Sequence, residues 1–132
     1  MEIHIKGNDV PAPILTEFGR VADHARLQKD QVHHDAVSGT VTIILDRLPI
    51  VGVTWFGTTR HTHVPVQTRV TIRNVTDCQI KRPQQEMTFT ILFGLKIEEK
   101  AIYFCSVEED HGEPLLSIEC RVSELDLEVK DD

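Results

Sequence analysis

From about residue 40 almost to the C-terminus, apolar residues in this chain alternate with polar ones. The clearest run is residues 87–95, where Met, Phe, Ile, Phe and Leu occupy every second position. Successive side chains of a β-strand point to opposite faces, so a period of two indicates strands with one buried and one solvated face. The pattern favours a sheet that folds over so that one part of its apolar face packs against another part.

The alternating segments are separated by turn-forming residues. We predict strands over residues 1–6, 40–45, 50–57, 66–80, 87–95, 101–107 and 115–122, with residues 125–129 extending the last strand or adding another. The turn at residues 46–49 predicts a first hairpin between segments 40–45 and 50–57. Consecutive strands with short links and no helical pattern between them favour an antiparallel meander, curled into a barrel or folded into a sandwich, and exclude a parallel α/β sheet.

One segment has a helical period instead. Apolar residues at 14, 15, 18, 21, 22 and 25 fall on one helical face and predict a helix over roughly residues 13–29. The fold class is therefore α+β, mainly β, with one N-terminal helix. At 132 residues we expect a single domain over 1–132, with the N-terminal strand and helix in about 1–32 and the β barrel or sandwich in about 36–129.

Composition limits the partners and the compartment. The net charge of −7 disfavours general binding to nucleic acid or to an anionic membrane surface. No apolar run is long enough to span a bilayer, and no basic, hydrophobic leader follows Met1, so a cytoplasmic location is expected. The three cysteines lack CxxC spacing and are interpreted as reduced thiols, with Cys105 and Cys120 as cross-strand neighbours packed in the core.

The charge is divided unevenly along the chain. Residues 57–85 hold five basic residues and a single acid, whereas residues 98–132 hold twelve acids and three basic residues. One interpretation is solvated outer faces that attract each other within or between subunits. The other is an interaction surface with regions of both signs.

His61 and His63 are the best candidates for metal ligands. In an extended segment the imidazoles at i and i+2 lie on the same face, a workable geometry for two ligands of a divalent metal. A third ligand is absent from the local sequence, although His33, His34, Asp35 or His111 could approach in the fold. The interpretation without metal is a loop that carries two histidines by chance.

His33, His34 and Asp35 form a second polar cluster. A carboxylate beside an imidazole can orient and charge it for acid–base chemistry. Adjacent residues of an extended chain point in different directions, however, so capping and local hydrogen bonding are the competing interpretation.

Trp55 is the only tryptophan and lies just before a polar stretch with Arg60. A tryptophan in such a position is either a core residue or, if exposed beside basic residues, a binding hot spot. The basic residues Arg69 and Arg73 lie on the predicted wet face of the following strand. Trp55, Arg60, Arg69 and Arg73 are therefore the predicted binding residues, and no catalytic residue is predicted.

Two resemblances bear on function. The segment from Gly57 through His61 and His63 to Gln67 resembles part of a cupin motif, although Gln67 stands where that family has a glutamate ligand and residues 94–120 lack the second motif. More broadly, His34-Asp35-Ala36, Asn74-Val75 and Gly112-x-x-Leu115 resemble small bacterial β-rich domains of unknown function, some of them like immunity proteins of toxin systems. The second resemblance implies a role without catalysis.

Two functions remain open from the sequence. The first is a non-enzymatic binding or protein-interaction module without a cofactor, which binds a protein partner or itself. The second is a small, cupin-like metal enzyme that uses His61 and His63. In either case we expect a homodimer, because the open edges of an antiparallel sheet need covering.

Overall fold

The computed structural model describes residues 2–7, 12–13, 25–47, 50–53, 55–61 and 64–131. The described chain is mostly β-strand, and every strand pair is antiparallel, as predicted. The elements are β1 (Glu2–Lys6), β2 (Arg26–Gln28), the 3-10 turn η1 (Lys29–Gln31), β3 (Val32–Asp35), β4 (Thr40–Arg47), β5 (Ile50–Val53), β6 (Thr59–His61), β7 (Val66–Ile72), β8 (Val75–Lys81), β9 (Thr88–Lys96), β10 (Ala101–Ser106), β11 (Glu109–Asp110), β12 (Glu113–Pro114), β13 (Ser117–Val122) and β14 (Asp126–Asp131).

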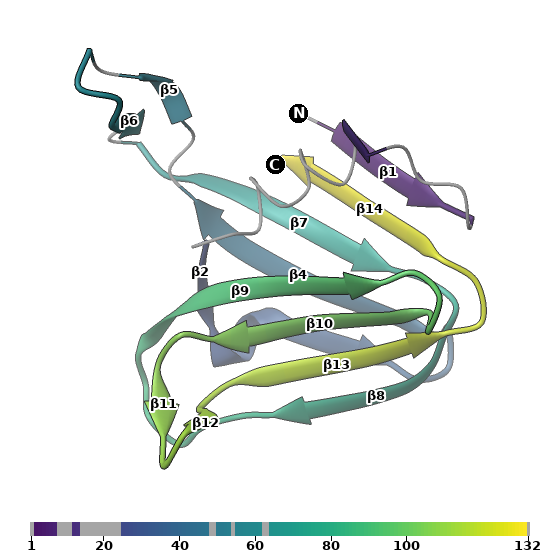
Figure 1. The fold of residues 1–132 in the computed structure, drawn as a ribbon. Coiled ribbons are helices and arrows are strands. Elements are labelled where there is room, and N and C mark those ends of the chain that lie inside the picture. Colours follow the sequence, from purple (N-terminus) through teal and green to yellow (C-terminus); the bar gives the residue numbers. More distant parts are fainter. Residues whose placement is uncertain are drawn as a thin grey trace.

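Ten strands form one sheet in the order β1-β14-β7-β4-β2-β9-β10-β13-β8, with β3 also paired to β4. The path runs from β1 at one end to β8 at the other, and it does not close into a barrel. Figure 1 shows the sheet folded over into two layers, with β9, β10, β13 and β8 in the lower part of the view, β4 behind β9 and β10, and β7, β14 and β1 above them. The short strand β2 pairs with both β4 and β9 and so joins the layers.

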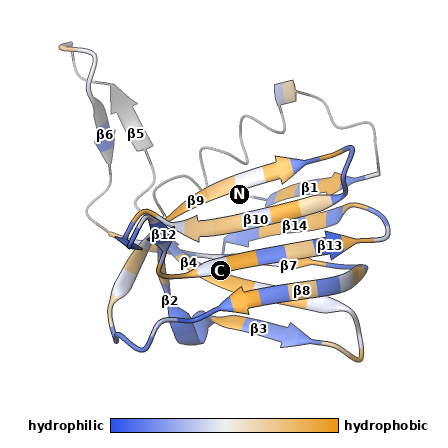
Figure 2. Ribbon diagram, turned by 60° about the horizontal axis from the view of Figure 1, so that its bottom comes forward, coloured by the Kyte–Doolittle hydropathy of each residue, from blue (hydrophilic) through white to orange (hydrophobic). Residues whose placement is uncertain are grey.

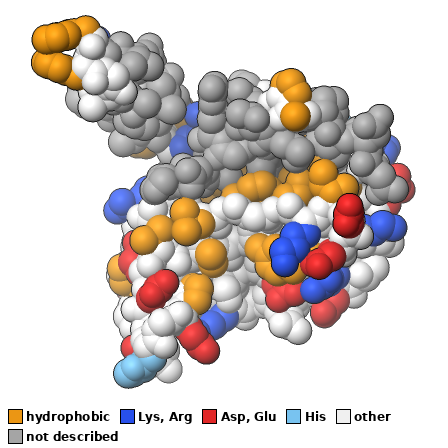
Figure 3. Space-filling view, in the orientation of Figure 1, with side chains coloured by type: hydrophobic (Ala, Val, Ile, Leu, Met, Phe, Trp, Pro, Cys, Tyr) orange, Lys and Arg blue, Asp and Glu red, His pale blue; other side chains and the backbone are white. Residues whose placement is uncertain are grey.

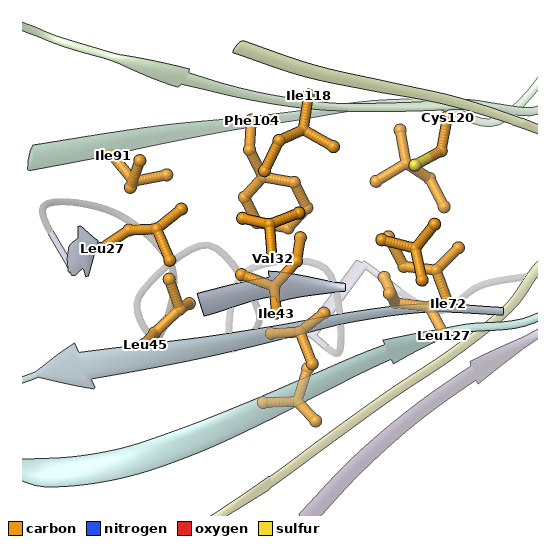
Figure 4. Packing of buried hydrophobic residues seen from close by; sticks show 14 of the residues in the cluster. Leu27, Val32, Ile43, Leu45, Ile72, Ile91, Phe104, Ile118, Cys120 and Leu127 are labelled. Carbon is orange, nitrogen blue, oxygen red and sulfur yellow. The ribbon is translucent and has the colours of Figure 1, made fainter. Parts of the chain in front are cut away.

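The core lies between the two layers. Each layer buries every second residue, as the alternating hydropathy of the strands in Figure 2 illustrates. Figure 4 shows side chains from the two layers pointing toward one another, among them Ile43 and Leu45 of β4 and Ile91 and Phe104 of the opposite layer. The prediction that residues 87–95 form a half-buried strand is confirmed in β9, where Phe89 is fully buried.

The predicted strand over residues 66–80 is wrong as a single element. It is two strands, β7 and β8, which belong to different layers and meet at Arg73 and Asn74. Asn74 has a φ of 59°, and asparagine tolerates this left-handed conformation better than most residues. The backbone amide of Val75 then donates to the carbonyl of Gly39 at 2.9 Å, which holds the corner against the β3–β4 turn.

The predicted helix over residues 13–29 is wrong at its C-terminal end. Residues 26–28 form β2, whose pairing with β4 and β9 buries Leu27, and residue 29 begins the turn η1. Pairing on both sides outweighs the helical period there, because it buries an apolar side chain and satisfies backbone groups. The rest of the prediction, residues 14–24, lies outside the described residues.

The predicted hairpin between segments 40–45 and 50–57 is also wrong. β4 pairs with β7 on one side and with β2 and β3 on the other, so neither edge is left for β5. β5 instead pairs with β6, which lies in the polar stretch that contains Arg60 and for which no strand is predicted. The meander therefore holds only in part. β3 pairs with β4 and β9 with β10, and β10 pairs with β13 across the small β11–β12 hairpin, whereas β14 lies between β1 and β7.

The prediction that Cys105 and Cys120 are cross-strand neighbours is wrong. In the β10–β13 register Cys105 faces Ser117 and Cys120 faces Ile102. The pairs of β10 and β13 are centred on residue 111, so the partner of Cys105, six residues before this centre, is Ser117, whereas Cys120 lies nine residues after it. Cys120 lies opposite Cys78 of β8 instead.

A polar network closes the core where β4 ends and β7 begins. Arg47 donates from Nε to the hydroxyl of Thr68 at 2.8 Å and from Nη2 to both carboxylate oxygens of Asp131, at 2.9 and 2.7 Å. The Thr68 hydroxyl donates to Asp131 at 2.7 Å. Burial opposes ionisation of Asp131, but these hydrogen bonds and the charge of Arg47 outweigh it and lower the pKa of the carboxyl.

We predict that Asp131→Asn lowers the free energy of unfolding at neutral pH by about 1–3 kcal/mol, because it removes a charge-assisted pair and leaves a largely buried guanidinium without its carboxylate. The folded-state pKa lies below the ordinary value of 3.8, so this stabilisation is present above that value and is lost as the pH falls through the folded-state pKa. Denaturant unfolding between pH 7 and pH 2 measures it.

The difference between wild type and Asp131→Asn should therefore shrink toward zero in acid. Glu109→Gln is the matched control, because Glu109 is exposed, and we expect a change of less than about 0.5 kcal/mol. Equal stability of wild type and Asp131→Asn at pH 7 would contradict the role given to the network.

Candidate functional site

The hairpin of β5 and β6 stands apart from the main sheet. It forms a separate two-stranded sheet with Gly52 opposite Arg60 and Val53 opposite Thr59. Figure 1 shows it extending beyond the ends of β4 and β7, the two strands that carry it. We call β5, β6 and the turn residues 55–58 between them the arm.

Two aromatic side chains lie in the turn of the arm. Trp55 is 87% exposed and Phe56 is 72% exposed, and their ring centroids are 3.9 Å apart. The next residue, Gly57, has a φ of 86°, a conformation that glycine adopts without the steric cost of a Cβ. Hydrophobic side chains are visible at the end of the arm in Figure 3. The tip is therefore a convex aromatic surface open to solvent.

Phe56 was not among the predicted binding residues. The pair Trp55-Phe56 is visible in the sequence, but an apolar segment such as residues 50–56 is equally compatible with a core strand. The exposure of the pair depends on which strands cover β5, and this is a property of the tertiary structure.

The arm has no acidic residue. Between residues 50 and 65 the one residue that is always charged is Arg60, which is exposed on β6. Since the whole chain has a net charge of −7, the entire acidic excess lies outside this segment. The arm and the rest of the chain therefore have opposite electrostatic character.

The histidine pair cannot be placed as a unit. His61 is the last residue of β6 and faces Ile50, but its side chain lies outside the described residues, as does all of His63. In the described part of the chain, no three His, Cys, Asp or Glu side chains are grouped to hold a metal ion. The metal site therefore stays a prediction.

Arg69 is exposed on the outer face of β7, as predicted, and Arg73 directly follows the last residue of this strand. Arg73 Nη1 is 3.4 Å from a carboxylate oxygen of Asp126 and 3.4 Å from one of Glu128, both on the neighbouring strand β14. His4 Nε2 of β1 is 2.7 Å from the same Asp126. Burial opposes ionisation of Asp126, but His4 and Arg73 outweigh it and lower the pKa of this carboxyl.

This outer-face network brings the basic and the acidic regions of the sequence together within one subunit. Arg73 belongs to the basic region and its partners to the acidic one. Arg69, in contrast, lies beside Lys130 and Ile44 in the register. The four predicted binding residues do not form one cluster: Trp55 and Arg60 are on the arm, Arg69 is on β7, and Arg73 is at the corner after β7.

His33, His34 and Asp35 are all exposed. Asp35 Oδ1 accepts hydrogen bonds from the backbone amides of Val37 and Ser38, at 3.1 and 3.3 Å. The hydrogen bonds from Ser38 lower the pKa of the Asp35 carboxyl. Asp35 thus organises the turn between β3 and β4, as the interpretation of local hydrogen bonding predicted.

Two surface hollows are lined by residues 28–29 with 86–88 and by residues 95–99. Neither contains Trp55, Arg60, Arg69 or Arg73. In the first hollow Lys29 and Glu86 form an ion pair at 2.8 Å, so the two charges satisfy each other.

No protein-family model, curated protein or solved structure matches this chain. In the described ranges, no helix has the length and apolar character needed to cross a membrane. In the described part of the chain, the arm with its exposed Trp55 and Phe56 is the most distinctive exposed feature.

We predict that the arm contributes little to the stability of the isolated subunit. Phe56→Ala should change the free energy of unfolding by less than about 0.5 kcal/mol, because the ring is exposed. Phe104→Ala, the same chemical change at a ring that is 1% exposed, should cost about 3–5 kcal/mol. Denaturant unfolding at the lowest practical protein concentration compares the two.

A large loss of stability from Phe56→Ala would contradict the exposed position of the tip. A small loss from Phe104→Ala would contradict the packing between the two layers.

Proposed function

We propose that this chain is a non-enzymatic protein-interaction module that associates with a second copy of itself through the arm. In this arrangement Trp55 and Phe56 of one copy pack against the body of the other, and the two-fold relation repeats the contact. The observation that carries the proposal is the exposure of both aromatic rings at the end of a projecting hairpin.

The chemistry of the tip supports this function. Tryptophan is enriched among the residues that dominate binding energy at protein interfaces, and aromatic side chains bury a large area when covered. Exposed apolar groups that gather in one place are a feature of interaction sites, whereas scattered ones are ordinary. The two rings at the tip are adjacent and 3.9 Å apart, so one pocket can cover both.

The architecture of the arm also supports self-association. A lone two-stranded hairpin is marginally stable in water and gains stability when it packs against a third element. In the described strands, β5 and β6 form a sheet with each other alone. A second copy supplies the missing surface.

The distribution of charge favours a second copy of this chain as the partner that covers the tip of the arm. The arm carries Arg60 and no acid, and the rest of the chain carries the acidic excess. An arm placed on the body of another copy therefore brings opposite charges together, whereas two arms placed against each other would bring like charges together. Arg73 is less suited to such a contact, because Asp126 and Glu128 already share its charge.

The test is the oligomeric state, measured by sedimentation velocity and light scattering over a range of concentrations. We expect wild type to dimerise and the double variant Trp55→Ala/Phe56→Ala to lose at least about 100-fold in affinity, as hot-spot residues do. The control is Val37→Ala/Val107→Ala, which removes exposed apolar groups elsewhere, at 101% and 48% exposure, and should dimerise like wild type.

Two further readouts sharpen this test. Emission of Trp55, the sole tryptophan, should shift to the blue as wild type associates. Arg60→Glu should weaken association and reduce its dependence on salt. A wild type that stays monomeric at every concentration would overturn the proposal and leave a different protein or a lipid surface to cover the tip. A Trp55→Ala/Phe56→Ala variant that dimerises like wild type would also overturn the proposal.

A further inference from the structure

Two cysteines face each other inside the fold. Cys78 of β8 and Cys120 of β13 are partners in the antiparallel register, and their sulfur atoms are 3.8 Å apart. Cys120 is fully buried, and Cys78 is partly buried at the margin of the core. The arm and its proposed contacts involve neither residue.

The hydrogen bonding of β13 defines the kind of pair they form. The amide of Ser106 donates to the carbonyl of Leu116, and the amide of Val122 donates to the carbonyl of Lys100. In a β-strand the backbone amide and carbonyl of one residue point toward the same neighbouring strand, and those of the next residue point toward the other neighbour. The amides and carbonyls of the even-numbered residues of β13 therefore point toward β10. Cys120 accordingly makes no ladder hydrogen bond with β8, and Cys78–Cys120 is a non-hydrogen-bonded pair.

This type of pair suits a covalent link. Directly opposite residues at non-hydrogen-bonded positions have Cα atoms about 4.5 Å apart, with their side chains closer than at the alternate positions. That separation lies in the range that disulfides span, about 4.4–6.8 Å. Side-chain rotation is then sufficient to bring the sulfurs from contact to a bonding distance of about 2.0 Å, and the two strands keep their register.

We propose that Cys78 and Cys120 are an oxidative modification site, where a low-molecular-weight disulfide converts the two thiols into an intramolecular disulfide between β8 and β13. The Cys78 thiolate attacks one sulfur of the small disulfide and releases one small thiolate, which takes up a proton. Cys120 then loses its proton and attacks the Cys78 sulfur of the mixed disulfide, which releases the second small thiol. Two protein thiols are oxidised and one small disulfide is reduced to two thiols.

The environment sets the order and the pace of these steps. Cys78 reacts first because it is the more accessible of the two. Burial raises the pKa of both thiols, and Cys120 is affected more strongly. Since the thiolate is the nucleophile, the reaction is slow near neutral pH and accelerates as the pH rises.

The link would act on a strand at the edge of the sheet. β8 ends the strand order, and the backbone groups of Cys78 point away from β13. At the end of β8, the Arg82 guanidinium donates to the carbonyls of Lys29 and Val32, the latter at 2.8 Å. Oxidation would add a covalent bond in the middle of β8 and restrict its separation from β13.

Cys105 provides the matched control. It lies on β10 opposite Leu92 and Ser117, with no cysteine across from it in either register. The same oxidant should therefore convert Cys105 to a mixed disulfide with the small thiol, which is a different product.

The experiment treats the folded chain with oxidised glutathione at pH 8.5, quenches with acid, and maps disulfides by peptide mass spectrometry without reduction. In Cys105→Ser we expect loss of two hydrogens, about 2 Da, and a fall from two free thiols to none. Cys78→Ser and Cys120→Ser, each combined with Cys105→Ser, should instead gain one glutathione or remain unmodified.

Wild-type protein is mapped in parallel, so the result does not depend on how well the variants fold. A peptide pair linked through Cys78 and Cys120 supports the proposal. If glutathione adds only to Cys105 while Cys78 and Cys120 stay reduced after prolonged exposure, the proposal is wrong. It is also wrong if both cysteines form separate mixed disulfides.

Discussion

Burial of one apolar face along both halves of a single antiparallel sheet is the interaction on which the rest of this structure depends. The hydrogen-bonded path from β1 to β8 folds over, and the side chains of β4, β7 and β14 meet those of β9, β10 and β13. Ile43 and Leu45 on one side and Phe104 on the other are almost completely excluded from water. Because each strand contributes every second residue, both layers keep a polar outer face.

The edges of this core are held by polar contacts of different kinds. Arg47, Thr68 and Asp131 close the end from which the arm extends, and they tie β4, β7 and β14 together. At another edge, Arg82 reaches from the end of β8 to backbone carbonyls near β3. The strand ends nearest the arm are thus held together, since Arg47 and Val66 are paired in the register directly beside the network.

The sequence predicts which residues are buried far better than which strands pair. Alternation is a local property: β13 buries every second residue, and β9 buries Phe89 and Ile91 and partly buries the next two apolar residues on the same face, although Met87, before the strand, is exposed. The corner at Asn74 was missed because the buried residues of β7 and the partly buried Cys78 and Ile80 of β8 all fall on even numbers, so the period continues while the chain changes layer. The pairing of Cys78 with Cys120 depends on strands that are distant in sequence, and no local pattern encodes it.

If the arm forms the contact between two copies, its tip is open in the isolated subunit and covered when the copies associate. Hydrogen exchange followed by mass spectrometry, at protein concentrations below and above the association range, tests it directly. We expect the amides of residues 50–61 to exchange rapidly in dilute protein and to become protected in concentrated protein, while those of β9, β10 and β13 are protected at both concentrations. Exchange in the arm that does not change with concentration, or is as slow as in the core strands throughout, would contradict it.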